Sequence, residues 1–140
     1  MCSPGRSPTP SACWAPTPPL RPTRTATRDP AYGLFDPSYT NHTLCLGTVE
    51  RWTVRTDETV PTFNHPFHLH TNQILVTHRN GRRLRPPVWH DTVGLASGTP
   101  GQSVTFLVKY EHFTGRTIAH CHHLHHEDLG MMQTVHYVEP

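Results

Sequence analysis

A histidine-rich stretch in the last part of the chain limits most strongly how this sequence can fold. Residues 120–132 read HCHHLHHEDLGMM and hold five of the 13 histidines, one cysteine and two methionines. A second histidine motif, HPFHLH, occupies residues 65–70. Imidazole, thiolate and thioether groups bind transition metals such as copper and zinc. We therefore expect a fold that brings these two distant segments together around metal ions.

The alternation of side chains along an extended strand sorts the ligands into two groups. His68 and His70 are predicted to share one face of a strand, and His120 and His122 one face of another. Cys121 lies between the last two, so its side chain should point to the opposite face. The chain is therefore predicted to form two different metal sites back to back, joined through the backbone at Cys121.

The sulfur-containing residues indicate copper at one of these sites. A cysteine, two histidines and a weakly bound methionine form the ligand set of a blue-copper site. His126 follows Cys121 by five residues, and Met131 follows His126 by five, so one short loop can surround an ion. His65 can supply the second imidazole. Met132 competes with Met131 for the axial position, and the spacing favours Met131.

Composition restricts the other partners that the chain could have. The formal net charge is +2 and the three tryptophans are scattered, which is unlike a basic nucleic-acid-binding face with stacking aromatic residues. The chain contains no run of about 18 apolar residues, so no transmembrane segment is expected. We therefore expect neither a nucleic-acid nor a membrane partner. Residues 1–30 lack an apolar core of the signal-peptide kind, so no secretory signal is expected in them.

The composition also divides the chain into two parts. Residues 1–30 hold eight of the 15 prolines together with many serines and threonines, and we expect this segment to be disordered. Residues 31–140 are expected to form one domain without a long helix, because strand-like runs alternate there with turn signals. These runs are residues 48–55, 72–78, 103–110, 116–120 and 134–138. About six or seven short strands predict an all-β, Greek-key β-sandwich.

Three stretches of residues 31–140 resemble one known family. HPFHLH, HCHHLHHEDLGMM and FDPSYTNHTLCLGTVERWTV at 35–54 are similar to the C-terminal, third cupredoxin domain of multicopper oxidases. That family includes laccases, bilirubin oxidases and bacterial copper-resistance oxidases, and HEDLGMM resembles most the bacterial members with an axial methionine. The resemblance implies a cupredoxin-like, or plastocyanin-like, Greek-key sandwich.

The resemblance also implies a set of copper ligands. The type 1 copper ligands would be His65, Cys121, His126 and, in the axial position, Met131. The ligand of type 2 copper would be His68, and those of type 3 copper would be His70, His120 and His122.

The activity that the resemblance implies is that of a laccase-like, copper-binding oxidoreductase. An electron from a small reducing substrate would enter type 1 copper near His126 and leave through Cys121. It would pass through His120 and His122 to a trinuclear copper cluster that reduces dioxygen to water. Glu127 occupies the position of an acidic residue implicated in proton supply in similar oxidases. The alternative for Glu127 is a surface carboxylate that orients a ligand histidine.

One departure from the family pattern leaves the function open between alternatives. The family cluster uses eight histidines, four of them from an N-terminal cupredoxin domain, and these 140 residues contain no such domain. The chain is therefore expected to be a truncated member with a partial type 2/type 3 site, inactive alone toward dioxygen. Alternatively, an N-terminal multicopper-oxidase domain or a second copy completes the cluster, or the chain is a single-domain blue-copper electron carrier or copper-binding protein. The pattern does not identify the reducing substrate or the compartment, although relatives are often periplasmic or extracellular.

Overall fold

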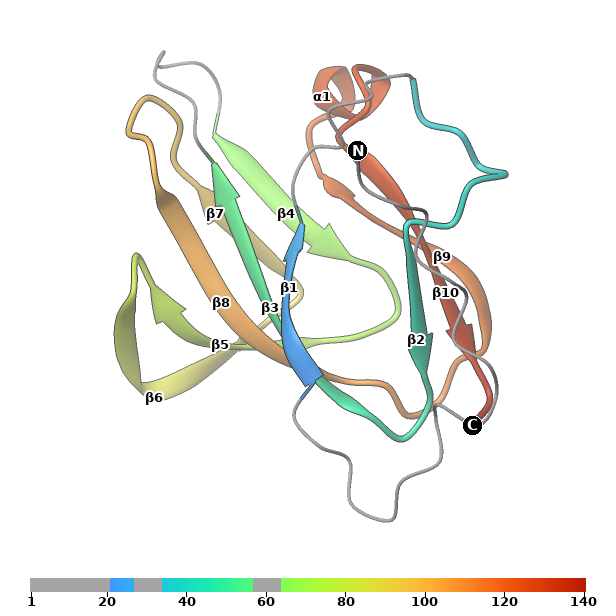
Figure 1. Cartoon of the computed structure of the whole chain (residues 1–140). Coiled ribbons are helices and arrows are strands. Elements are labelled where there is room, and N and C mark those ends of the chain that lie inside the picture. The colour runs from blue at the N-terminus through green and yellow to red at the C-terminus, as the bar shows by residue number, and fades with distance from the viewer. Residues whose placement is uncertain (1–20, 27–33, 57–63) are drawn as a thin grey trace.

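The computed structural model describes residues 34–56 and 64–140, and the backbone of residues 21–26. These residues form two five-stranded sheets that face each other (Figure 1). The arrangement confirms the predicted all-β, cupredoxin-like sandwich. Among the described residues the helical content is one short element, α1 (Leu124–Asp128), and no helix there is long and apolar enough to span a membrane.

The first sheet has the strand order β1-β3-β8-β5-β6. Its strands are β1 (Arg21–Ala26), β3 (Val49–Thr56), β8 (Gln102–Lys109), β5 (Ile74–Arg79) and β6 (Arg82–His90). The turn between β5 and β6 contains Asn80 and Gly81, whose φ angles are 49° and 74°. Two successive positive φ angles suit the tight hairpin turn that an Asn-Gly pair favours, so local sequence chemistry fixes this connection.

The second sheet has the strand order β2-β10-β9-β4-β7. Its strands are β2 (His42–Cys45), β10 (Met132–Val138), β9 (Gly115–Cys121), β4 (His65–Leu69) and β7 (Thr92–Leu95). β4 and β9 pair in antiparallel fashion, with Phe67 opposite Cys121 and His68 opposite His120. This ladder joins the two histidine motifs although they are far apart in the sequence.

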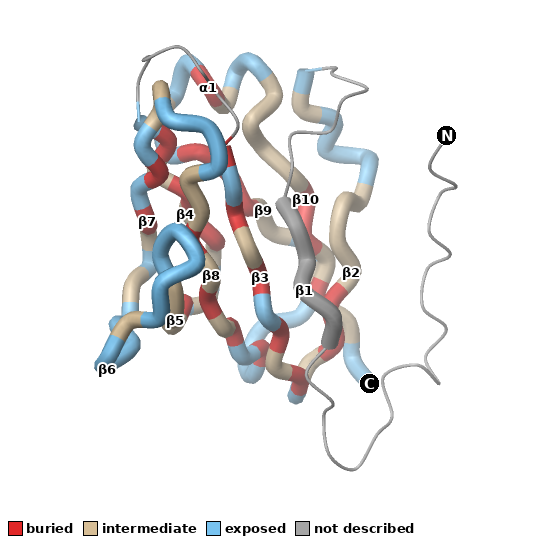
Figure 2. The backbone as a smooth tube through the Cα atoms, turned by 60° about the vertical axis from the view of Figure 1, so that its left-hand side comes forward, coloured by how far each residue is buried: buried red, intermediate tan, exposed pale blue. Residues whose placement is uncertain are grey.

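The hydrophobic core lies between the sheets, and burial alternates with a period of two along strands such as β3 and β4 (Figure 2). In β3, Trp52 is fully buried and its Nε1 donates a hydrogen bond of 2.9 Å to the hydroxyl of Tyr110. The Trp52 ring also stacks on Phe106 of β8 with centroids 6.2 Å apart. Burial of each such side chain contributes about 1.5–3 kcal/mol, so the sheets are held face to face by apolar packing.

The number of strands differs from what the sequence predicted, and one short helix was not predicted. The structure has strands β2 to β10 within residues 31–140, where about six or seven were expected. β6 escaped prediction because its side chains are almost all exposed, which removes the alternation that identifies a half-buried strand. α1 is only five residues long, too short to show helical periodicity. Of residues 1–30, which were predicted to be disordered, only the backbone of β1 is described; residues 1–20 and 27–33 lie outside the described part.

The core position Ile74 provides a test of this packing. Its side chain is 0% exposed, so Ile74→Ala should lower the free energy of unfolding by about 2–5 kcal/mol through lost burial and a residual cavity. Urea unfolding followed by tryptophan fluorescence measures the change. The matched control is Val88→Ala in β6, where the side chain is 44% exposed and the expected change is within about 0.5 kcal/mol. Equal losses in the two variants would contradict this core.

Candidate metal centre

The β4–β9 ladder presents different residues to its two faces. On β4, His65 is buried and His68 is half-buried, as expected for side chains on opposite faces of a strand. On β9, His120 and Cys121 are neighbours with 6% and 7% of their surfaces exposed. Both can be buried because the two faces of the strand are covered by different groups of side chains.

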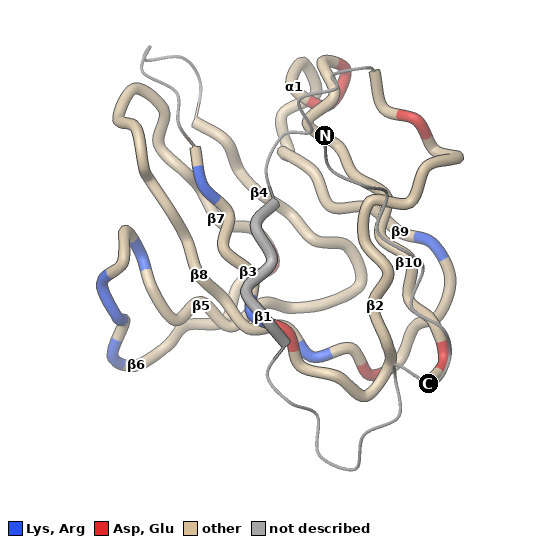
Figure 3. The backbone as a smooth tube through the Cα atoms, viewed as in Figure 1, with Lys and Arg blue, Asp and Glu red and all other residues tan. Residues whose placement is uncertain are grey.

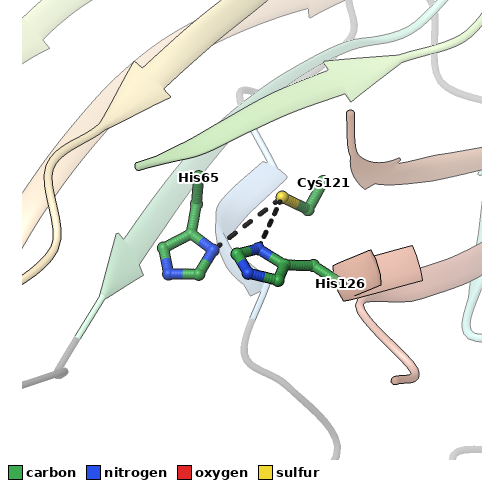
Figure 4. A group of neighbouring side chains, drawn as sticks. All are labelled: His65, Cys121 and His126. Carbon is green, nitrogen blue, oxygen red and sulfur yellow. Dashed lines mark hydrogen bonds between the residues drawn. The ribbon is translucent and has the colours of Figure 1, made fainter. Parts of the chain in front are cut away.

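The first group consists of His65, Cys121 and His126 (Figure 4). The Cys121 Sγ lies 3.8 Å from Nδ1 of His65 and 3.5 Å from Nδ1 of His126. The two imidazole rings have centroids 4.7 Å apart. Each of the three residues has at most 8% of its surface exposed. The structure thus brings together a thiol and two imidazole nitrogens from β4, β9 and α1 in a nearly dry pocket.

The chain between Cys121 and Met131 closes around this group through backbone hydrogen bonds. The Cys121 amide donates to the carbonyl of Met131, and the Met131 amide donates to the carbonyl of His126, each over 2.9 Å. Leu129 ends the helical turn of α1 by donating to His125 over 3.2 Å. These bonds hold His126 and Met131 beside Cys121, and the Met131 side chain is half-buried.

The donor set and its spacing fit a bound transition metal. A metal ion about 2.0–2.3 Å from nitrogen and sulfur ligands keeps neighbouring ligand atoms roughly 3.3–4 Å apart. The separations from Cys121 Sγ to the two Nδ1 atoms, 3.8 and 3.5 Å, fall in that interval. Two imidazoles and a thiolate in a trigonal arrangement are the strong ligands of blue-copper sites. The residues present therefore suit copper.

The second group lies on the other face of the ladder and contains imidazoles from both motifs. Ligand atoms of His68, His70 and His120 all lie within 4.8 Å of one another. Nε2 of His70 is 3.0 Å from Nε2 of His120. His122 borders the three, with its ring centroid 5.6 Å from that of His68 and 5.3 Å from that of His120. His122 is exposed, so this group opens toward the surface.

Outer contacts orient two of these imidazoles. Nδ1 of His68 donates to the carbonyl oxygen of Asp91 over 2.8 Å and also lies 3.1 Å from the Thr92 hydroxyl. Nδ1 of His120 lies 2.7 Å from Oε1 of Glu127. Because a carboxylate oxygen can only accept, the N–H of His120 donates this hydrogen bond. A proton on Nδ1 leaves Nε2 with its lone pair in a neutral imidazole. Both rings are therefore prepared to bind metal through Nε2.

The protonation of His70 favours the same chemistry. Partial burial lowers the pKa of the His70 imidazole below its ordinary value of 6.5, because the charged form loses hydration. The neighbouring imidazoles lower the pKa further, since a second positive charge among them would be repelled. His70 is therefore neutral near pH 7, and a neutral imidazole is the form that coordinates a metal.

The structure brings the predicted ligand cysteine and histidines into two groups of side chains, while Met131 is placed beside Cys121 by backbone hydrogen bonds. Cys121 turns toward His65 and His126, while His120 and His122 turn toward the other side of the ladder. The other seven histidines of the described part are not among these two groups, although the His123 ring stacks on His126 with centroids 4.5 Å apart. These are His42, His78, His90, His112, His123, His125 and His136.

Three residues that contact the ligand imidazoles were partly or wholly hidden in the sequence. Asp91 contacts His68 through its backbone carbonyl. A backbone contact leaves no mark in the residue type, and Thr92 gave no signal at all. Of the two alternatives for Glu127, the orienting one has a direct contact, the hydrogen bond to His120.

A two-sheet sandwich with a buried cysteine held between two histidines defines a cupredoxin-like, copper-protein type of domain. Residues 14–139 match the sequence model of the multicopper oxidase family. Among relatives, a multicopper oxidase of Staphylococcus haemolyticus is 33% identical over 99 residues, which cover 70% of this chain and 22% of that protein. A laccase of Haloferax volcanii is 36% identical over 92 residues, or 62% of this chain and 15% of that protein.

Solved structures show the same likeness. The crystal structure of a multicopper oxidase from Pediococcus acidilactici matches with a TM-score of 0.72 and 28% identity, over 89% of this chain and 28% of that one. The chain therefore belongs to the multicopper oxidase family and is a cupredoxin-like domain of it. It spans about a fifth of the length of the Staphylococcus relative.

The contact between Glu127 and His120 yields a test of the second group. Glu127→Gln removes the charge that holds His120 Nδ1–H, so the affinity of the His68, His70 and His120 group for copper should fall about 10–100-fold. Competitive copper titration with a chelator measures this affinity. Asp128→Asn, one residue further along and exposed, is the control and should leave the affinity unchanged. A similar loss of copper affinity in both variants would mean that negative charge near the site supports copper binding, and not this hydrogen bond.

Proposed function

We propose that this chain is the C-terminal, third cupredoxin domain of a multicopper oxidase, which accepts electrons at a type 1 copper site and carries half of a trinuclear cluster. His65, Cys121 and His126 hold the type 1 copper, with Met131 as the axial ligand. The observation that carries the proposal is the position of Cys121, whose sulfur faces two imidazoles while the adjacent His120 faces the second group.

The protein's contribution at the first group is a fixed and nearly dry set of ligands. Copper bound there supplies one-electron redox chemistry. Because His65, Cys121 and His126 are each at least 92% buried, water has little access to the ligand atoms. The backbone bonds of the 121–131 loop fix the ligands before metal binds. Such preorganisation keeps the geometry similar in the two oxidation states and lowers the cost of electron transfer.

The covalent link between the two groups is the shortest route through the chain for an electron. From Cys121, one peptide bond leads to His120 and one to His122. We assign these histidines and His70 to type 3 copper and His68 to type 2 copper. An electron received from a small reducing substrate therefore has a continuous path toward the place where dioxygen is reduced.

Glu127 is assigned a role that follows from its contacts. Its carboxylate accepts the hydrogen bond of His120 Nδ1, and its side chain remains 15% exposed. The first contact orients a ligand, and the remaining exposure lets the carboxyl group exchange protons with solvent. Glu127 thus serves as a positioning residue for His120 and as a proton donor toward dioxygen reduction.

The cluster needs a partner that supplies its remaining histidines. The described chain contributes the imidazoles of four residues to the second group, and His122 there is exposed. The beginning of α1 beside it carries Leu124, which is 78% exposed. Open ligands next to an apolar side chain suit burial by an N-terminal multicopper-oxidase domain. A second copy of this chain is the alternative partner.

Because the first group is complete within this chain, a second function, electron transfer by a single-domain carrier, also has support. A single-domain electron carrier requires only the type 1 ligands, and the chain provides these by itself. Such a carrier has no use for four clustered imidazoles on the opposite face of the ladder. Measurements on the copper-loaded chain separate the two functions.

The type 1 assignment is tested by Cys121→Ser in the full chain loaded with Cu(II). We expect the intense blue absorption of the thiolate–copper bond in the wild-type chain and its loss in the variant, because serine does not provide a thiolate. Metal analysis should still find copper bound by the second group. The control is His125→Gln, an exposed residue of the same loop, which should keep the blue absorption. A wild-type chain that binds copper without this absorption contradicts the proposal.

Oxygen uptake and sedimentation in the same samples distinguish the forms of assembly. A blue monomer without oxygen uptake supports an incomplete cluster in the chain alone. Uptake that rises with protein concentration together with a dimeric mass supports pairing of two copies. A blue monomer whose second group binds no copper supports the electron carrier and contradicts the oxidase.

The axial position is tested by Met131→Leu. Removing the thioether should raise the reduction potential of the type 1 site, because the weak sulfur ligand stabilises the oxidised ion more than the reduced one. A redox titration followed by the blue absorption measures the potential. Met132→Leu is the matched control and should change the potential much less. A larger change in the control would assign the axial role to Met132.

A further inference from the structure

Two adjacent methionines, Met131 and Met132, follow the loop that surrounds the first group of ligands. The Cys121 amide donates to the Met131 carbonyl over 2.9 Å, and Met132 stands opposite His120 in the β10–β9 ladder. Residues directly opposite each other in a ladder project their side chains from the same face of the sheet. Met131 therefore shares a face with Cys121, and Met132 shares the other face with His120. The strand pairing thus places one thioether on the side of each group of ligands.

Met132 and His120 form the kind of cross-strand pair in which side chains come closest. In an antiparallel ladder, pairs joined by backbone hydrogen bonds alternate with pairs that lack them, and the latter have Cα atoms only about 4.5 Å apart. Cys121 and Met131 are joined by a backbone hydrogen bond, so the next pair along the ladder, His120 and Met132, is of the closer kind. Met132 is half-buried, and its side chain leaves the backbone directly beside that of His120.

His120 turns its Nε2 atom toward a second imidazole on this face. Its Nδ1 donates to Oε1 of Glu127 over 2.7 Å, and its Nε2 lies 3.0 Å from Nε2 of His70. His70 directly follows β4, which pairs with β9 on the side opposite to β10. The methionine side chain is unbranched and has three rotatable bonds, so the Met132 sulfur can turn toward the place where the two nitrogen atoms meet.

Two imidazoles and one thioether form a donor set that suits monovalent copper. Soft sulfur ligands select Cu(I), whereas the zinc ligands of proteins are thiolate, imidazole and carboxylate groups. The role differs from that proposed for Met131, which is a weak fourth ligand beside the Cys121 thiolate. Among the described residues the second group consists of imidazoles, so a thioether there is a third ligand and decides which metal ion is preferred.

The charges near the second group suit a cation. The Glu127 carboxylate contacts His120 directly, and residues 117–140 contain no lysine or arginine. Figure 3 shows acidic residues on α1, while basic residues gather along the hairpin that includes β6. A local excess of one charge raises the concentration of ions of the opposite charge, so a copper ion is attracted to this end of the domain.

We propose that Met132 is a ligand of the second group, and that the chain alone binds one Cu(I) ion there through His70, His120 and Met132. Copper at the second group rests on the proposed function, whereas a ligand role for Met132 does not follow from a cluster built of histidines. The thioether holds the ion until a partner supplies its imidazoles, one of which then takes the place of the sulfur. Met132 thereby serves to load copper before the cluster is complete.

The methyl signals of methionine in NMR test the contact directly. The full chain, labelled with ¹³C-methyl methionine and ¹⁵N histidine, is titrated with Cu(I) without oxygen in a chelator buffer that fixes the free Cu(I) concentration. Because each signal reports its own site, the thiols elsewhere in the chain do not affect the reading. In Cys121→Ser, which removes the thiolate of the first group, the Met132 methyl should shift together with the ring signals of His70 and His120.

Three other outcomes overturn the proposal for different reasons. If the rings shift and the Met132 methyl does not, copper binds through imidazoles alone and only the role of Met132 is wrong. If the methyl shifts in the wild-type chain but not in Cys121→Ser, its sulfur belongs to the first group. If neither signal shifts, the second group takes no Cu(I), and a Cu(II) titration of Cys121→Ser followed by EPR shows whether the proposed function fails with it.

Met132→Leu separates a ligand from a packing side chain. Leucine has nearly the volume of methionine, and such exchanges are among those that proteins tolerate best. The Cu(I) affinity of the second group should fall about tenfold, which corresponds to about 1.4 kcal/mol, while its Zn(II) affinity should stay within about twofold. The matched control is Ile118→Leu, a half-buried neighbour of His120 on the same face of β9, which should change neither affinity. Equal losses for both ions in Met132→Leu would make Met132 a packing residue and overturn the proposal.

Discussion

The antiparallel ladder between β4 and β9 is the constraint on which both groups of ligands depend. It sets Phe67 opposite Cys121 and His68 opposite His120, and it thereby brings two distant motifs into one sheet. A strand that slipped by one residue would turn every side chain to the other face. Cys121 would then meet the imidazoles of the second group, and neither group would keep its ligands. The register of this one pair of strands therefore determines the chemistry of the domain.

Apolar packing is what specifies that register. Phe67 and Leu69 of β4 and Ala119 of β9 are 7%, 0% and 2% exposed, and all belong to the hydrophobic core. A slipped register would move them out of the core and bring His68 and His120 into it, at the cost of burying imidazoles without their present partners. The proposed copper ligands on the two faces thus rely on side chains that belong to neither group. Stability and metal binding are coupled through the same strands.

Much of this arrangement could be predicted from the sequence, because it follows from periodicity. Alternation along strands places Cys121 opposite to His120 and His122, and the spacing from Cys121 to Met131 predicts a closed loop. Other features depend on contacts that residue types do not reveal. The Asp91 carbonyl reaches His68 only because β7 pairs with β4.

The two groups differ in how far this chain completes them. The first group is enclosed by β4, β9 and α1, and its three ligands are buried. In the second, partial burial and then the neighbouring imidazoles lower the pKa of His70, and His122 lies exposed at its edge. Asp91 and Glu127 accept hydrogen bonds from two imidazoles of that open group, His68 and His120. A simple electron carrier would not require these contacts. The two groups therefore differ in enclosure: buried residues surround the first, and the second stays open at His122.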